Sequence, residues 1–185
     1  KLNRLILTSR TYALADESRS RRLTAEEIRD SLLLLSGQLS TKPVGEHELP
    51  TIRRLQNSQG RPYRRSFAEV EKHRSLYLFQ HRNAPHPFLN IFDGADPSAN
   101  TPIRGESTTA LQGLFFLNSE LFHYCADAFA RRLEQAGLEW GFQAAYGCRP
   151  TEAQLNLAKR LFAETKDWKA VARVLLASNQ FIHVE

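Results

Sequence analysis

The chain has 185 residues, of which 42% are hydrophobic, and it carries a formal net charge of +5. We expect one domain over residues 1–185, because this length supports a real core and the apolar fraction is ordinary for a soluble protein. No run approaches the roughly 20 consecutive apolar residues of a membrane-spanning helix, so we expect no membrane span. The sequence starts at Lys1 inside a helical pattern and without a signal sequence, which favours a piece of a longer or processed polypeptide.

The positive charge is concentrated in the first half of the chain. Residues 1–82 hold 16 Lys and Arg against 9 Asp and Glu, whereas residues 83–185 hold 9 against 11. The basic region between Arg53 and Arg82 could meet nucleic acid, an anionic polysaccharide or an acidic partner surface. The competing interpretation, which we favour, is a solvated loop. Nucleic-acid binding is the least favoured function, because these residues lie in an irregular segment and not along a recognition helix.

Two helices are predicted in the first quarter of the chain. Apolar residues at helical spacing predict the first over about residues 2–14. Thr24 and Glu27 have the spacing of a capping box and precede an apolar stripe, which predicts a helix over 25–39. Residues 40–74 show little periodicity and are interrupted by proline and glycine, so we expect a long irregular segment there.

Two short segments have the composition of strands. Residues 75–80 and 180–184 are rich in aromatic or β-branched side chains and are bounded by polar residues. We expect the two to pair. The remaining segments are helical in pattern, and their capping residues are Ser107 or Thr108 for a helix ending near Asn118, then Ser119, Thr151 and Asp167. The predicted fold class is therefore mainly α: a helical domain with a small two-stranded β element and a long irregular segment.

The least interchangeable residues fall within the central stretch, residues 86–118. Asp93 and Asp96 follow a short, mostly apolar run there, in a segment whose residues favour turns. Paired carboxylates can act as acid and base or hold a hard cation, so both are candidate catalytic residues, and His81 and His86 are candidate ligand-binding residues. The competing interpretation, which we favour, is that the aspartates satisfy turn amides. The histidines lack a ligand signature such as H-E-x-x-H, so no metal site is predicted.

Arg104 stands close to Ser107 and Thr108, at the expected start of a helix. Such a group can receive an anion, which makes Arg104 a candidate catalytic residue and the two hydroxyl residues candidates for ligand binding. The competing interpretation, which we favour, is an internal salt bridge from Arg104 to one of the two aspartates. Cys125 and Cys148 have no metal-ligand or haem-attachment spacing, and we expect free, buried thiols and no cofactor in this chain.

Several stretches in order carry a family resemblance. They are residues 7–12, 21–39, 74–82, HPFLNIFDGADPSANTP, 107–118, GCRPTEAQ and LLASNQFIHVE. Together they resemble the planctomycete secreted domain of unknown function. The residues that match its pattern are Arg82, Pro87, Phe88, Phe92, Asp93, Asp96, Pro97, Arg104, Ser107, Thr108, Gln112, Asn118 and Pro150. Two positions depart from it, because Ala110 stands where proline is expected and Cys148 where arginine is expected.

The resemblance implies an exported protein, periplasmic or at the cell surface, in which this chain is the C-terminal domain. It implies a sister domain in the same polypeptide and a c-type cytochrome module as partners, with any haem outside this chain. Our first hypothesis is a docking or structural module of such a protein. The alternative is a hydrolase or lyase acting on an anionic polysaccharide, with Asp93, Asp96 and Arg104 at the site. The region Arg53 to Arg82 would hold the substrate, which adds Arg82 to the candidate ligand-binding residues.

Overall fold

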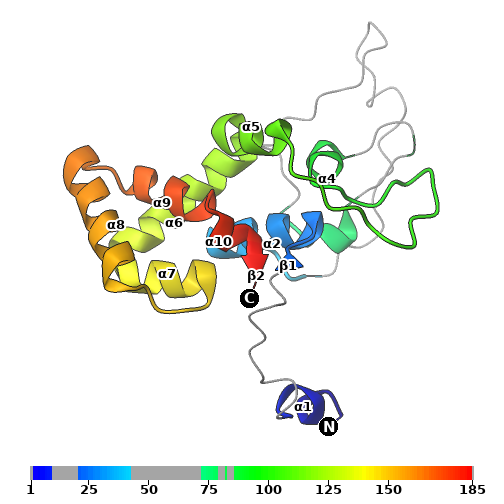
Figure 1. The fold of residues 1–185 in the computed structure, drawn as a ribbon, viewed down its shortest axis with the longest axis horizontal. Coiled ribbons are helices and arrows are strands. Elements are labelled where there is room, and N and C mark those ends of the chain that lie inside the picture. Colours follow the sequence, from blue (N-terminus) through cyan, green and yellow to red (C-terminus); the bar gives the residue numbers. More distant parts are fainter. Residues whose placement is uncertain (1, 10–20, 43–71, 79–81, 83–85, 185) are drawn as a thin grey trace, which may run out of the picture.

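The protein is described here by a computed structural model, which covers residues 2–9, 21–42, 72–78, 82 and 86–184. The predicted fold class is confirmed, since helices dominate these residues and one small antiparallel sheet accompanies them (Figure 1). The elements are α1 (Leu2–Leu7), β1 (Arg21–Arg22), α2 (Ala25–Leu35), η3 (Ser75–Tyr77), α4 (Pro87–Ile91), α5 (Ala110–Asn118), α6 (Glu120–Ala136), α7 (Leu138–Tyr146), α8 (Glu152–Thr165), α9 (Trp168–Leu176), α10 (Asn179–Ile182) and β2 (His183–Val184).

Local capping contacts start most of the longer helices where the sequence predicts them. The Thr24 hydroxyl accepts from the Glu27 N–H while the Glu27 carboxylate accepts from the Thr24 N–H, which completes the capping box of α2. Thr151 forms the same reciprocal box with Gln154 at the start of α8. Ser119 and Asp167 cap α6 and α9 by accepting one backbone N–H each through a side-chain oxygen. These contacts satisfy backbone donors that have no partner inside the helix.

Three predicted helix boundaries differ from the structure. The helix predicted over 25–39 ends at Leu35, because the backbone turns at Gly37 with a φ of 72°, a left-handed conformation that glycine adopts without strain. The helix near residue 110 is capped by Thr109, not by Ser107 or Thr108, and the Thr109 N–H donates to the Gln112 side chain at 3.3 Å. The helix predicted over 2–14 is observed only over Leu2–Leu7, since residues 8 and 9 are not helical. Residues 10–14 lie outside the described part, as does most of the predicted irregular segment.

One strand of the small sheet, β2, lies inside the predicted segment 180–184, but its partner is not the predicted one. β1 pairs with β2 in antiparallel register, with Arg21 opposite Val184 and Arg22 opposite His183. The predicted strand over 75–80 is wrong in its described part, because residues 75–77 form the 3₁₀ helix η3. The Ser75 N–H and hydroxyl both donate to Asp30 on α2, each at 2.7 Å, and this holds the segment in a turn. Of the segment 180–184, only the last two described residues are extended.

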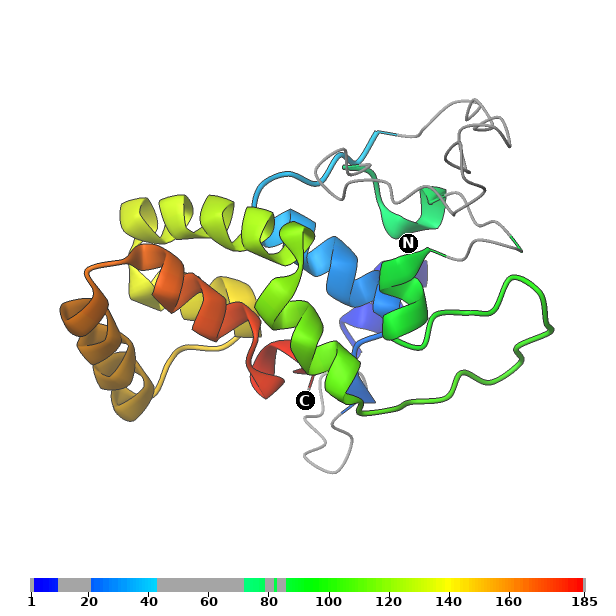
Figure 2. The same cartoon turned by 90° about the horizontal axis from the view of Figure 1, so that it is seen from above.

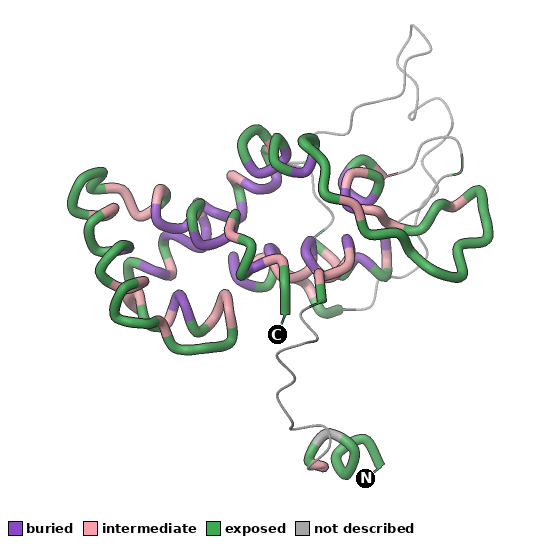
Figure 3. The backbone as a smooth tube through the Cα atoms, in the orientation of Figure 1, coloured by how far each residue is buried: buried purple, intermediate pink, exposed green. Residues whose placement is uncertain are grey.

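The core is built around α6, whose buried face meets α2, α5, α7 and α9 (Figures 2 and 3). Edge-to-face contacts between aromatic rings join α4, α5 and α6 into one cluster, which consists of Phe88, Phe92, Phe115, Phe116 and Phe122. Cys125 is buried in this core and Cys148 is exposed, and both are free thiols, so the expectation of burial holds only for Cys125. No helix within the described ranges is long and apolar enough to cross a membrane.

Candidate functional site

The central stretch is held by a polar clasp around Asp93, which follows α4. Asp93 lies in the left-handed region with a φ of 60°, a conformation that aspartate tolerates better than most residues. Its carboxylate accepts from the Ser107 N–H at 2.9 Å and from the Ser107 hydroxyl at 2.7 Å. The Arg22 guanidinium donates to the same carboxylate at 3.1 Å. The turn after α4, the segment before α5 and the strand β1 are therefore tied at one point.

Two side chains of this clasp, Arg22 and Gln112, were not predicted from the sequence to contact Asp93. The Arg22 guanidinium also donates to the Ser107 carbonyl and lies 5.8 Å from the centre of the Phe92 ring. The Gln112 amide donates to the Ile91 carbonyl at 3.0 Å and lies 3.4 Å from the Asp93 carboxylate. We call Arg22, Asp93, Ser107 and Gln112 the Asp93 clasp. Of Arg22 and Gln112, only Gln112 matches the family pattern, and this match was the one feature of the sequence that could have pointed to either residue.

The clasp favours the ionised form of Asp93. Partial burial of the carboxyl raises its pKa, but the Ser107 hydroxyl and N–H and the Arg22 guanidinium outweigh burial, so the net effect is a pKa below the ordinary value. An acid catalyst must instead hold its proton near the working pH. The carboxylate therefore behaves as an acceptor that is engaged by the protein's own donors.

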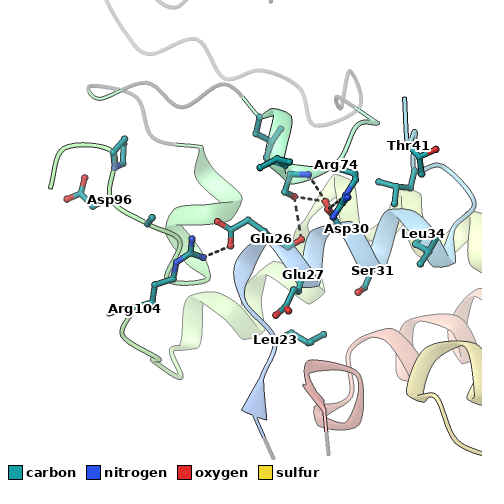
Figure 4. Close-up of a pocket in the computed structure, with 16 residues that line it drawn as sticks. Leu23, Glu26, Glu27, Asp30, Ser31, Leu34, Thr41, Arg74, Asp96 and Arg104 are labelled. Atoms are coloured by element: carbon teal, nitrogen blue, oxygen red, sulfur yellow. Dashed lines mark hydrogen bonds and ion pairs between the residues drawn. The ribbon is translucent and has the colours of Figure 1, made fainter. Parts of the chain in front are cut away.

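Asp96 and Arg104 do not join this clasp. The Asp96 carboxylate is exposed and accepts from the Ser98 N–H at 2.8 Å, which is the turn-amide role favoured from the sequence. The predicted salt bridge from Arg104 to an aspartate is wrong, because Arg104 reaches across to Glu26 on α2 at 2.5 Å (Figure 4). The cause is the path of the loop, which carries Arg104 over α2 and away from Asp93.

An open groove of about 960 Å³ lies beside α2 and contains the candidate residues Asp96 and Arg104 (Figure 4). Glu26 and Asp30 lie on its α2 side, and Arg74 approaches Asp30 to 3.8 Å. A second pocket of about 220 Å³ is lined by His86, Asn90 and Asp96, among others. Asp93 lines neither of these two pockets, so neither of them brings the two aspartates together.

The other candidate ligand-binding residues are scattered. Arg82 and Thr108 are exposed, and the Arg82 carbonyl accepts from the Ser98 hydroxyl at 3.4 Å. His81 lies outside the described residues. The described ranges contain no group of three or more His, Cys, Asp or Glu side chains arranged to hold a metal ion. The structure thus brings together Asp93 and Ser107, and places Asp96 and Arg104 along a different surface.

A buried polar group on α2 was missed from the sequence. Arg29 is buried among apolar residues and donates to the His73 carbonyl at 2.9 Å and to the Ser75 hydroxyl at 3.2 Å. The sequence feature that could have revealed this buried group is an arginine on the apolar stripe of the helix, between Ile28 and Leu32. These contacts fix η3 against α2 and so shape the groove wall.

The comparisons with known proteins identify a family. Residues 13–162 match PSD1, a protein of unknown function (DUF1553), and this range includes the whole Asp93 clasp and the described groove. No curated protein and no solved structure matches the chain. Because the matched range covers more than half of its length, the chain belongs to the PSD1 family of proteins of unknown function (DUF1553).

Proposed function

We propose that this chain is a docking or structural module, the C-terminal part of a secreted multidomain protein of planctomycete type that also carries a c-type cytochrome module. Its nearest partner in this proposal is the sister domain of the same polypeptide. The exported setting, the sister domain and the cytochrome module rest on the resemblance described from the sequence. The observation that carries a docking role is the outer face of α5.

Helix α5 is apolar on both sides. Its inner side buries Phe115 and Phe116 in the core. Its outer side exposes Leu111, Leu114 and Leu117, at 63%, 49% and 69% of their full accessible area. A helix that is apolar all round is normally covered on all sides, and contiguous exposed apolar surface marks interaction sites. This face, the α5 outer face, therefore supports docking of a partner domain.

The Asp93 clasp gives that face a fixed position. Arg22 from β1 and Gln112 from α5 meet at the same carboxylate, which follows α4. Rigidity of this kind lowers the entropy lost when a partner binds. The clasp supports a structural role for the central stretch, because its donors already occupy the carboxylate that a catalytic site would need.

The experiment is binding between this chain and the sister domain, produced as separate proteins. Titration calorimetry should detect binding between the two proteins. The double variant Leu114→Gln with Leu117→Gln should raise the dissociation constant at least tenfold. The matched control is Leu157→Gln, an equally apolar and exposed position on α8, which should leave binding unchanged. Unaltered binding by the double variant, or an equal loss in the control, would exclude the α5 outer face as the docking surface.

The alternative, a hydrolase or lyase acting on an anionic polysaccharide, has no observation in its favour among the described residues. Asp93 is engaged by internal donors, and Asp96 lines a different surface. The test is the melting temperature with sulfated or uronic polysaccharides, because a ligand that binds only the folded state raises it. A saturable increase that Asp96→Asn and Arg104→Gln abolish would favour the enzyme over the docking module.

A further inference from the structure

Gly113 gives the α5 outer face a notch. It lies one helical turn before Leu117 and directly before Leu114, so it is on the same side of α5 as these leucines. Gly113 is itself exposed. Apart from the backbone of α5 and the two adjacent residues, no described atom lies within 4 Å of the position that a Cβ at Gly113 would take. The Leu117 side chain therefore does not fill this space.

The fold of the described residues does not explain a glycine at this position. Glycine is needed where φ is positive or where another group approaches the backbone closely. Gly113 is not in the left-handed region and has open space around it. Gly141 on α7 differs, because a Cβ there would overlap the Leu133 side chain. Since glycine is among the least favourable residues inside a helix, the notch at Gly113 fits a contact with a partner better than a contact within the chain.

The α5 outer face favours a partner surface without charge. Residues 110–118 include no acidic residue, no basic residue and no histidine. A charged group that is buried against this helix would lose its hydration and would meet no opposite charge on α5. Leu111, Leu114 and Leu117 offer apolar contacts instead. Because the cores of interfaces pack as densely as protein interiors, the surface that fits is apolar and also fills the notch.

We propose that the sister domain covers the α5 outer face with an apolar, uncharged segment, and that a large apolar side chain of this segment fills the notch at Gly113. This inference rests on the docking role proposed above and adds the residue that determines the fit. Leu114 and Leu117 supply apolar area. Gly113 determines the shape that can pack there, since a side chain at this position would clash with the partner.

The test fills the notch and measures binding to the sister domain by titration calorimetry. Gly113→Ala adds one carbon atom and Gly113→Leu adds four. We expect the dissociation constant to rise at least threefold for Gly113→Ala and at least tenfold for Gly113→Leu, because extra atoms overpack a filled contact. Gly113→Ala should melt above the parent protein, since it replaces a glycine inside a helix. Weaker binding by a more stable variant separates the interface from the fold.

The matched control is Ala163→Leu, which adds bulk at an exposed position of α8 and should change the dissociation constant less than twofold. An equal loss of binding in this control would overturn the inference. Unchanged or tighter binding by both Gly113 variants, while Leu114→Gln with Leu117→Gln still weakens binding, would overturn the notch and leave the docking role in place. No binding by the parent protein would overturn the docking role and the notch together.

Discussion

Replacing Asp93 with asparagine tests the clasp most directly. Asparagine has nearly the same shape and also tolerates the left-handed backbone found at this position. It has only one acceptor oxygen, and it removes the charge that faces Arg22, whose side chain is 10% exposed. Hydrogen bonds to charged groups are worth about 1.5–3 kcal/mol, and an uncompensated buried charge costs more. We expect Asp93→Asn to lower the free energy of unfolding by about 3 kcal/mol.

At about 2–4 °C per kcal/mol for a domain of this size, that loss lowers the melting temperature by roughly 6–12 °C. The measurement is a thermal melt followed by circular dichroism at neutral pH, supported by urea titration. Asp96→Asn is the control, because its exposed carboxylate accepts from one turn amide, and its cost should stay below about 1 kcal/mol. Equal shifts in the two variants would refute the view that Asp93 holds the central stretch together.

Other predictions concern packing, thiol access and acid stability. A Cβ at Gly141 would lie 2.0 Å from a buried leucine side chain of α6, so Gly141→Ala should destabilise by about 1–3 kcal/mol. By contrast, Gly113→Ala, with open space around it on α5, should stabilise by roughly 0.5–1 kcal/mol in the same melts. Alkylation at pH 8 should modify Cys148 in the native protein and spare Cys125 until urea is added, since burial raises the pKa of the Cys125 thiol to about 11. The hydrogen bond from Arg21 lowers the pKa of Glu27 from 4.5 to about 2. The stability that the ionised Glu27 contributes is therefore present above pH 4.5 and is lost as the pH falls towards 2. In urea titrations over this range, the free energy of unfolding should fall less with decreasing pH for Glu27→Gln than for the parent protein.

The sequence predicted parts of the candidate site and missed their connections. Asp93 and Ser107 were both candidates, and they lie in direct contact. The turn role of Asp96 was also favoured in advance, because a short side chain binds its own neighbouring amides. The partner of Arg104 was predicted wrongly, since Glu26 is 78 residues away along the chain. No periodicity or motif connects two residues at that distance.

What the sequence determined by itself was local: a mainly helical chain, the starts of α2, α6, α8 and α9, and the turn at Asp96. Each depends on contacts within about four residues, which the order of residues fixes. Only the tertiary structure decided that Arg22 meets Asp93, 71 residues apart, and that β1 pairs with β2 at the other end of the described chain. Those pairings follow from how α2 and α5 pack on α6, because burial of their apolar faces sets which distant polar groups come together.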